Sequence, residues 1–395
     1  MSAVTAESGS TPRSSSLARW RLLAGTGLAM MLHDKMKLAG ALAGVVFATL
    51  LATQQAGTFL GLMSKNTMLI DHSGADIWVI PAGAQTLQAG KAIPERDLHR
   101  ARGVSGVAWA SPLLWVGGSV QLPGGGTEQV TVLGVDLASM RGGPWNVVAG
   151  DAAMLSQPSA MIFEDSEREK LGGLNLGSVR EVNGRRAQAV GFTLGLLPFG
   201  PSYAFASYDF ARELSGRADR DQSMILVGVE PGRSPDEVVA RLRAKLPDVE
   251  VYTGSELAAR TIRYVVSATS MGTTFATSVF FGLLVGFVIV ALTMFSGVLD
   301  NLREFGTLKA IGATTGDLAR ILLVQAVVYA LVGSALGLTL VGNIARAMKS
   351  PQLAMVLPSA LIAVTPALML LICVVASTLG LLRLRKLEPA IVFRG

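Results

Sequence analysis

Long hydrophobic runs without any charged residue are the dominant pattern along this chain. Four stretches contain no Asp, Glu, Lys or Arg: residues 38–64, 264–299, 321–345 and 350–382. A helix of about 20 apolar residues crosses the hydrocarbon core of a bilayer, and in lipid a helix satisfies its own backbone hydrogen bonds. The pattern predicts four transmembrane helices, placed at residues 38–62, 273–298, 321–342 and 358–382.

Small residues recur at four-residue spacing within these predicted helices. They are Gly40, Gly44, Ala48, Gly282, Gly286, Gly333 and Gly337. Such spacing lets helix backbones approach closely in lipid. The alternative is that glycine is simply common in membrane helices.

Residues 63–263 follow a different pattern, in which short apolar stretches alternate with Gly and Pro turns. Strands are predicted at 75–81, 106–122, 128–136 and 159–165. Further along, a strand within 221–232, an amphipathic helix with Val238, Val239 and Leu242 on one face, and a strand at 248–254 form a β-α-β unit. The fold class is an α-helical integral membrane protein with four transmembrane helices and a large α+β extracytoplasmic domain between helices 1 and 2.

Two subdomains are expected within this α+β domain. A β-rich part lies near residues 100–190, and an α/β part is assembled from roughly 65–100 and 200–255. The acidic residues of 164–169 alternate with Arg168 and Lys170, which is typical of a solvated helix start.

Composition agrees with a water-facing protein interrupted by membrane segments. The chain is 50% hydrophobic and only 16% charged, whereas soluble domains carry about 25% charge. All charged residues lie outside the four apolar stretches, so the charge density of the remaining chain is ordinary.

The distribution of basic residues predicts the orientation. The three pieces expected on one side hold 12 Lys/Arg and 6 acids; they are residues 1–37, 299–320 and 383–395. Short basic flanks stay inside, so both termini are predicted to be cytoplasmic, although Arg346 and Lys349 point weakly the other way. Residues 1–37 read as a polar tail followed by an interfacial helix that contains Trp20. The pI near 9.6 reflects this bias and does not indicate nucleic-acid binding.

Motifs for catalysis and nucleotide binding are missing from the sequence. There is no GxxxxGK[ST] loop, no HExxH and no GxSxG, and the three histidines stand apart. The single Cys373 excludes a disulfide within the chain. The predicted spans hold no ionisable side chain of the kind that ion-coupled transporters use. We therefore expect no enzyme activity, no cofactor and no metal site, and an energy source in another polypeptide.

Residues 299–320, between the second and third spans, form the most informative segment. Phe305, Leu308 and Ile311 recur at three-residue spacing, and Gly312 is placed to end a helix. The residues predict a short cytoplasmic helix followed by a turn. A simple structural connector is the alternative.

This segment, NLREFGTLKAIGATTGDLARILL, resembles the signature of FtsX-like/MacB-type ABC transporter permeases. Positions that fit the signature are Glu304, Gly306, Lys309, Ala310, Gly312 and Ala313. The layout of one span, a large outer domain and three spans is similar too, as is the closing LEPAIVFRG. ADIWVIPAG after the first span is most similar to the DevC-like branch.

The resemblance implies a function and a set of partners. Such a chain is the permease subunit of an ABC-type exporter in the bacterial inner membrane, working as a homodimer with a separate ATPase subunit that binds the ATP. A periplasmic adaptor (membrane fusion) protein and an outer-membrane duct are the further partners expected. The residues implied in ATPase coupling are Arg303, Glu304, Phe305, Gly306, Thr307, Leu308, Lys309, Ala310, Ile311, Gly312 and Ala313.

Two other functions remain open. FtsX relatives use ATP hydrolysis to switch a periplasmic enzyme such as a cell-wall hydrolase, but the outer domain here is larger than that branch implies. A membrane-anchored enzyme or sensor without an ATPase is the third possibility, and the segment at 303–313 argues against it. Nothing in the sequence selects the transported substrate.

Overall fold

The computed structural model describes residues 16–84, 87, 91–198, 200–268, 270–347 and 355–385. The predicted polar tail before residue 16, Lys349, and the closing LEPAIVFRG lie outside the described residues. Two compact units emerge, each described by itself. A helical unit comprises the described parts of 1–57, 275–348 and 357–395, and an α+β unit comprises those of 58–274 and 349–356.

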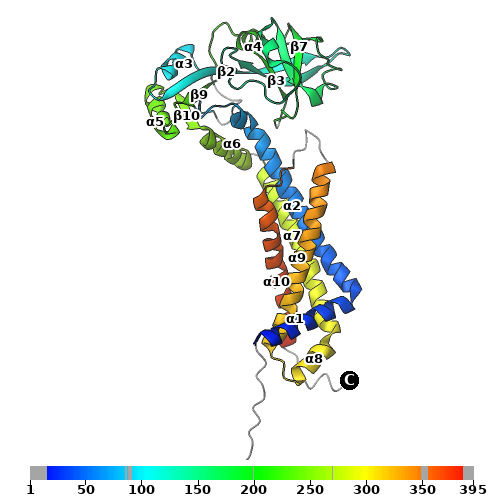
Figure 1. Ribbon diagram of the computed structural model, residues 1–395. Helices are drawn as coiled ribbons and strands as arrows, with labels where there is room; N and C mark the ends of the chain where they lie inside the picture. Colours follow the sequence, from blue (N-terminus) through cyan, green and yellow to red (C-terminus); the bar gives the residue numbers. More distant parts are fainter. Residues whose placement is uncertain are drawn as a thin grey trace, which may run out of the picture. The chain divides into compact units, whose positions relative to one another are not determined.

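The helical unit contains a bundle of long helices and two shorter ones (Figure 1). Their bounds are α1 Ser16–His33, α2 Lys35–His72, α7 Met271–Asp300, α8 Leu302–Ala310, α9 Thr315–Ala347 and α10 Ser359–Arg385. Of the described helices, α2, α7, α9 and α10 are long and apolar enough to span a membrane. This confirms the prediction of four membrane helices. The last part of α2, from residue 58, belongs to the α+β unit.

Close contacts at small residues hold α2 against α7 and α9. A Cβ added at Gly286 of α7 would lie 2.2 Å from the Cβ of Ala48 on α2. One added at Gly337 of α9 would lie 2.7 Å from the Cβ of Thr49. Real Cβ atoms do not approach so closely, so glycine is required at both contacts. The small-residue pattern therefore marks helix contacts at Ala48, Gly286 and Gly337, whereas a Cβ at Gly40 would meet no atom within 4 Å.

The α+β unit is built on one ten-stranded sheet (Figure 1). Its strands are β1 Ile77–Pro81, β2 Val107–Gln121, β3 Thr127–Val135, β4 Val147–Gly150, β5 Ala160–Glu164, β6 Val179–Val182, β7 Arg185–Thr193, β8 Ser202–Ser207, β9 Met224–Val229 and β10 Val249–Thr253. The order is β10-β1-β9-β2-β3-β8-β5-β7-β4, and β6 pairs with β2 and β7. Its helices are α3 Glu95–Arg102, α4 Tyr208–Ser215, α5 Pro235–Lys245 and α6 Gly254–Ala268, with 3₁₀ turns at Ala152–Ser156 and Asp165–Glu167.

All the strands predicted from the apolar stretches are present, and so is the β-α-β unit. Helix α5 connects β9 to β10, and β1 lies between these two strands, antiparallel to both. Val238, Val239 and Leu242 of α5 are buried, as their spacing predicted. The β1–β10 ladder pairs Ile77 with Thr253 and Pro81 with Val249.

The predicted boundary between the two subdomains was wrong at residue 200. Strand β8, Ser202–Ser207, pairs with β3 and β5, so it and α4 belong to the β-rich part. The α/β part resumes at β9. Strand β2 joins the two parts, because its first half pairs with β9 and its second half with β3. Such pairing is non-local, and the apolar run of β8 carries no sign of its partner.

The prediction of a solvated helix start at 164–169 was also wrong. Glu164 is the last residue of β5 and is only 1% exposed. Its carboxylate accepts hydrogen bonds from Gly195 N at 2.7 Å and Leu196 N at 3.0 Å, and from the hydroxyls of Thr193 and Ser166. A buried carboxylate must be satisfied by donors, and here the loop after β7 supplies the two backbone donors.

The Gly286 contact predicts a specific packing defect. Gly286→Ala is expected to lower the stability of the helical unit by about 1–3 kcal/mol, the usual cost of overpacking. Gly40→Ala is the control, since a Cβ there meets no atom within 4 Å. Thermal unfolding of the full chain in detergent measures the difference, and adding Ala48→Gly should restore the melting temperature. An unchanged melting temperature in Gly286→Ala would contradict the close contact.

The Glu164 hydrogen bonds predict a loss of stability in the α+β unit. Glu164→Gln replaces one accepting oxygen by an NH₂ donor that faces backbone N–H groups. The free energy of unfolding should therefore fall by about 1–3 kcal/mol. Glu169→Gln, at an exposed position of the same segment, is the control. Circular dichroism melting of the full chain tests this, and equal melting temperatures for both variants would show that Glu164 does not fix the loop.

Candidate functional site at the α7–α8–α9 connection

Helix α8 is joined to α7 through Asn301. The side-chain amide Nδ2 of Asn301 donates to the carbonyl of Gly297 at 2.8 Å. The backbone carbonyl of Asn301 accepts from Phe305 N at 3.0 Å. Asn301 thus closes the last turn of α7 and opens the first turn of α8. The chain changes direction here without leaving these helix-end groups unpaired.

The end of α8 is a Schellman motif. Gly312 has φ +100°, a conformation that favours glycine. Its N–H donates to Lys309 O at 3.2 Å, and Ala313 N donates to Leu308 O at 2.9 Å. This confirms that Gly312 ends the predicted helix.

A capping box then starts α9. The hydroxyl of Thr314 accepts from Asp317 N at 3.2 Å, and Asp317 Oδ2 accepts from Thr314 N at 3.0 Å. Asp317 is 1% exposed and pairs with Arg320 at 3.0 Å. The turn between α8 and α9 is therefore held from both sides. Sequence reasoning missed Asp317, although the Thr-x-x-Asp spacing before an apolar run was a signal for it.

The eleven residues implied in ATPase coupling divide between two faces. Phe305 and Gly306 are buried, and Phe305 belongs to the same core as Leu318 and Leu322 of α9. Leu308, Lys309 and Ala313 are half-buried. The exposed members are Arg303, Glu304, Thr307, Ala310, Ile311 and Gly312. Ile311, which directly follows α8, is 77% exposed.

An ion-pair cluster lies beside this connection, where α1 meets α2. Asp34 caps α2 by accepting from Lys37 N at 3.2 Å, and the Lys37 ammonium is 2.7 Å from the Asp34 carboxylate. Lys37 also pairs with Asp300, the last residue of α7. Hydrogen bonding from Lys37 lowers the pKa of the Asp34 carboxyl below its ordinary value.

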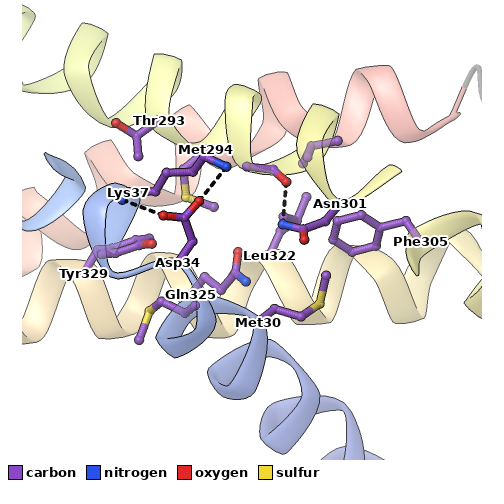
Figure 2. A pocket seen from close by; sticks show the side chains of 13 residues that line it. Met30, Asp34, Lys37, Thr293, Met294, Asn301, Phe305, Leu322, Gln325 and Tyr329 are labelled. Atoms are coloured by element: carbon purple, nitrogen blue, oxygen red, sulfur yellow. Dashed lines mark hydrogen bonds and ion pairs between the residues drawn. The ribbon is translucent and has the colours of Figure 1, made fainter. Parts of the chain in front are cut away.

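Asp34 and Lys37 line a small cavity of about 30 Å³ (Figure 2). Asp34, Lys37, Asn301, Phe305 and Tyr329 are among its lining residues. Residues of the α1–α2 junction and of the α7–α8 junction therefore line the same cavity. Sequence reasoning did not connect Lys37 with Asp300, because they are 263 positions apart.

Helix α1 is anchored separately on α9. Gln325 Nε2 donates to the carbonyl of Gly27 at 3.1 Å, and a Cβ at Gly27 would lie 3.1 Å from the carbonyl of Ile321. Met31 is buried in the core of the helical unit, whereas Trp20 is 46% exposed. One face of α1 therefore packs on the bundle and the other faces outward.

Comparison with known proteins assigns both units. Residues 38–245 match the family model of the MacB-like periplasmic core domain, and residues 276–389 match that of the FtsX-like permease C-terminal region. The chain belongs to the FtsX/MacB family of ABC transporter permeases. It is accordingly a multi-pass membrane protein, and a permease of an ABC transporter implies an ATPase partner. The whole segment 303–313 lies inside the FtsX-like match.

Similar sequences include uncharacterized ABC transporter permeases of Mycobacterium tuberculosis and Mycobacterium bovis. One from each organism is 26% identical over 366 residues, covering 89% of this chain and 93% of the relative. Among solved structures, the extracellular domain of the noncanonic ABC-type transporter YknZ from Gram-positive bacteria matches with a TM-score of 0.32 and 18% identity, over 45% of this chain and 99% of that one. The periplasmic region of MacB from Actinobacillus actinomycetemcomitans matches with a TM-score of 0.37 and 11% identity, over 48% and 94%.

The two faces of α8 predict opposite responses to truncation. Phe305→Ala removes a buried ring and should destabilise the helical unit by about 3–5 kcal/mol. Ile311→Ala should change stability by less than about 0.5 kcal/mol, because the side chain is exposed. Thermal unfolding of both variants in detergent checks this. A similar loss in the two variants would mean that α8 is not anchored through Phe305.

Proposed function

We propose that this chain is the membrane-spanning subunit of an ABC exporter in the bacterial inner membrane. In this role it transmits the ATP-driven motion of a separate ATPase to its α+β domain. The observation that carries the proposal is the two-faced helix α8. It exposes Arg303, Glu304 and Ile311 on one side and anchors Phe305 in the bundle core on the other.

The local geometry of α8 suits a force-bearing contact. Its two ends are defined by hydrogen bonds, at Asn301 and at the Gly312 turn. A push on the exposed face would therefore move α8 as a body and pass to α7 and α9. The partner binds the ATP, so this chain needs no cofactor of its own for the cycle.

The proposed assembly has α8 and both termini in the cytoplasm and the α+β domain outside. The excess of basic residues in 1–37, 299–320 and 383–395 supports this orientation. A homodimer, a periplasmic adaptor and an outer-membrane duct complete the exporter, by resemblance to the family. The charge-free spans suit a substrate taken from the periplasm or outer leaflet and pushed outward.

Regulation of a periplasmic enzyme, such as a cell-wall hydrolase, is the second candidate function. It would use the same α8 contact and the same ATPase. The large ten-stranded α+β domain and its match to the MacB-like core favour export. The proteins that accompany the chain separate the two functions.

Glu304→Lys is expected to release the ATPase. Reversing a charge at an interface places like charges together and costs several kcal/mol, so recovery of the ATPase should fall by about tenfold or more. Affinity purification of the tagged full chain from solubilised membranes, with identification of the proteins recovered, measures this. Glu169→Lys, at an exposed site in the α+β domain, is the control and should recover the ATPase like the wild type.

The same purification separates the hypotheses. Recovery of a membrane-fusion adaptor supports export, and recovery of a wall hydrolase supports the second function. If gentle crosslinking yields no ATPase with the wild-type chain, the proposed function is wrong. Equal recovery with Glu304→Lys would show that the exposed face of α8 is not the contact.

A further inference from the structure

Lys37 and Asp300 both carry charges that the ends of their helices disfavour. Lys37 is in the first turn of α2, where the helix dipole favours anions, and Asp300 ends α7, where it favours cations. Each side chain is therefore stabilised by a partner of opposite charge. The two pair with one another, and Asp34 is the second acid on Lys37.

This ion pair connects two junctions of the helical unit. Lys37 lies three residues after the α1–α2 break at Asp34, and Asp300 directly precedes Asn301, where α8 begins. A displacement of α8, whose first residue is Leu302, thus reaches Asp300 through Asn301 alone. Through Lys37 it reaches the start of α2.

The pair is also able to open. The Lys37 side chain is 29% exposed and that of Asp300 is 53% exposed, and such partly solvated pairs hold only weakly. The neighbouring cavity of about 30 Å³ is lined by Lys37 and has room for about two water molecules, which would hydrate its ammonium once the pair opens. The Asp300 carboxylate is already half exposed to solvent. The hydrogen bond from Gln325 to Gly27 holds α1 on α9 independently of the ion pair. Opening the pair therefore leaves α1 in place.

We propose that the Lys37–Asp300 ion pair is a transmission latch between the α8 connection and α2. While it is closed, the ends of α2 and α7 that flank it move together when the ATPase displaces α8. Lys37 and Asp300 are positioning residues in this role and touch neither ATP nor substrate. The inference rests on the proposed function, because it requires an ATPase that moves α8.

The experiment measures whether α2 follows α7 during the nucleotide cycle. Spin labels are placed at Met36 on α2, which is 84% exposed, and at Leu299 on α7, which is 36% exposed. A Cys373→Ala background removes the native cysteine. The full chain is purified with its ATPase, and the distance distribution is recorded by pulsed electron paramagnetic resonance with and without a non-hydrolysable ATP analogue.

With the wild type, the distance is expected to stay narrow and unchanged when the analogue binds. Lys37→Met and Asp300→Asn should each give a distance that shifts or widens on binding. The double reversal Lys37→Asp with Asp300→Lys should restore the wild-type response. Lys35→Met, two positions away on the same helix and exposed, is the matched control and should behave like the wild type.

Two results would overturn the latch. One is a wild-type response to the analogue in Lys37→Met. The other is a distance distribution that is equally wide with and without the analogue in the Lys37 and Asp300 variants, because the ion pair would then only stabilise the resting structure. Recovery of the ATPase with each variant is checked first. If the wild-type chain recovers no ATPase, the proposed function itself fails, whereas an ATPase that binds without the expected distance change refutes the latch alone.

Discussion

Close approach of α2 to α7 and α9 is the contact on which the rest of the helical unit depends. In lipid, moving an apolar side chain from the lipid tails into a helix interface yields no hydrophobic free energy, because both surroundings are apolar. Helices therefore associate through tight packing at small residues. Gly286 against Ala48 and Gly337 against Thr49 provide that packing on two sides of α2. This places the end of α7 beside the start of α2, which is what allows Lys37 to reach Asp300.

The short helix α8 gains its orientation from this bundle rather than from its own sequence. Nine residues make a marginal helix in isolation, and α8 has no side-chain cap hydrogen bond at its start. Its stability comes from Phe305 in the core, from the Asn301 junction, and from the Gly312 turn. The same few residues that fix the orientation of α8 therefore also determine that Glu304 and Ile311 face outward.

The sequence was most informative where the physical cause is local. Charge-free stretches indicated the four membrane helices, and short apolar stretches between Gly and Pro turns indicated the strands. Gly312 indicated the end of α8. It failed where the cause is a distant partner: nothing near Ser202–Ser207 shows that β8 pairs with β3, and nothing near Glu164 shows that the loop at Gly195 supplies its donors. Lys37 and Asp300 each look like ordinary helix-end charges until the fold pairs them.

The way the chain enters and leaves the α+β domain gives the latch its mechanical meaning. Helix α2 leads into β1, and β10 leads into α6 and on to α7, while β1 and β10 pair along five residues each, from Ile77–Thr253 to Pro81–Val249. Within the α+β unit, the strand that follows α2 thus pairs with the strand that precedes α6, and within the helical unit Lys37 and Asp300 pair the start of α2 with the end of α7. With the ion pair closed as proposed, the start of α2 and the end of α7 respond to the same push on α8.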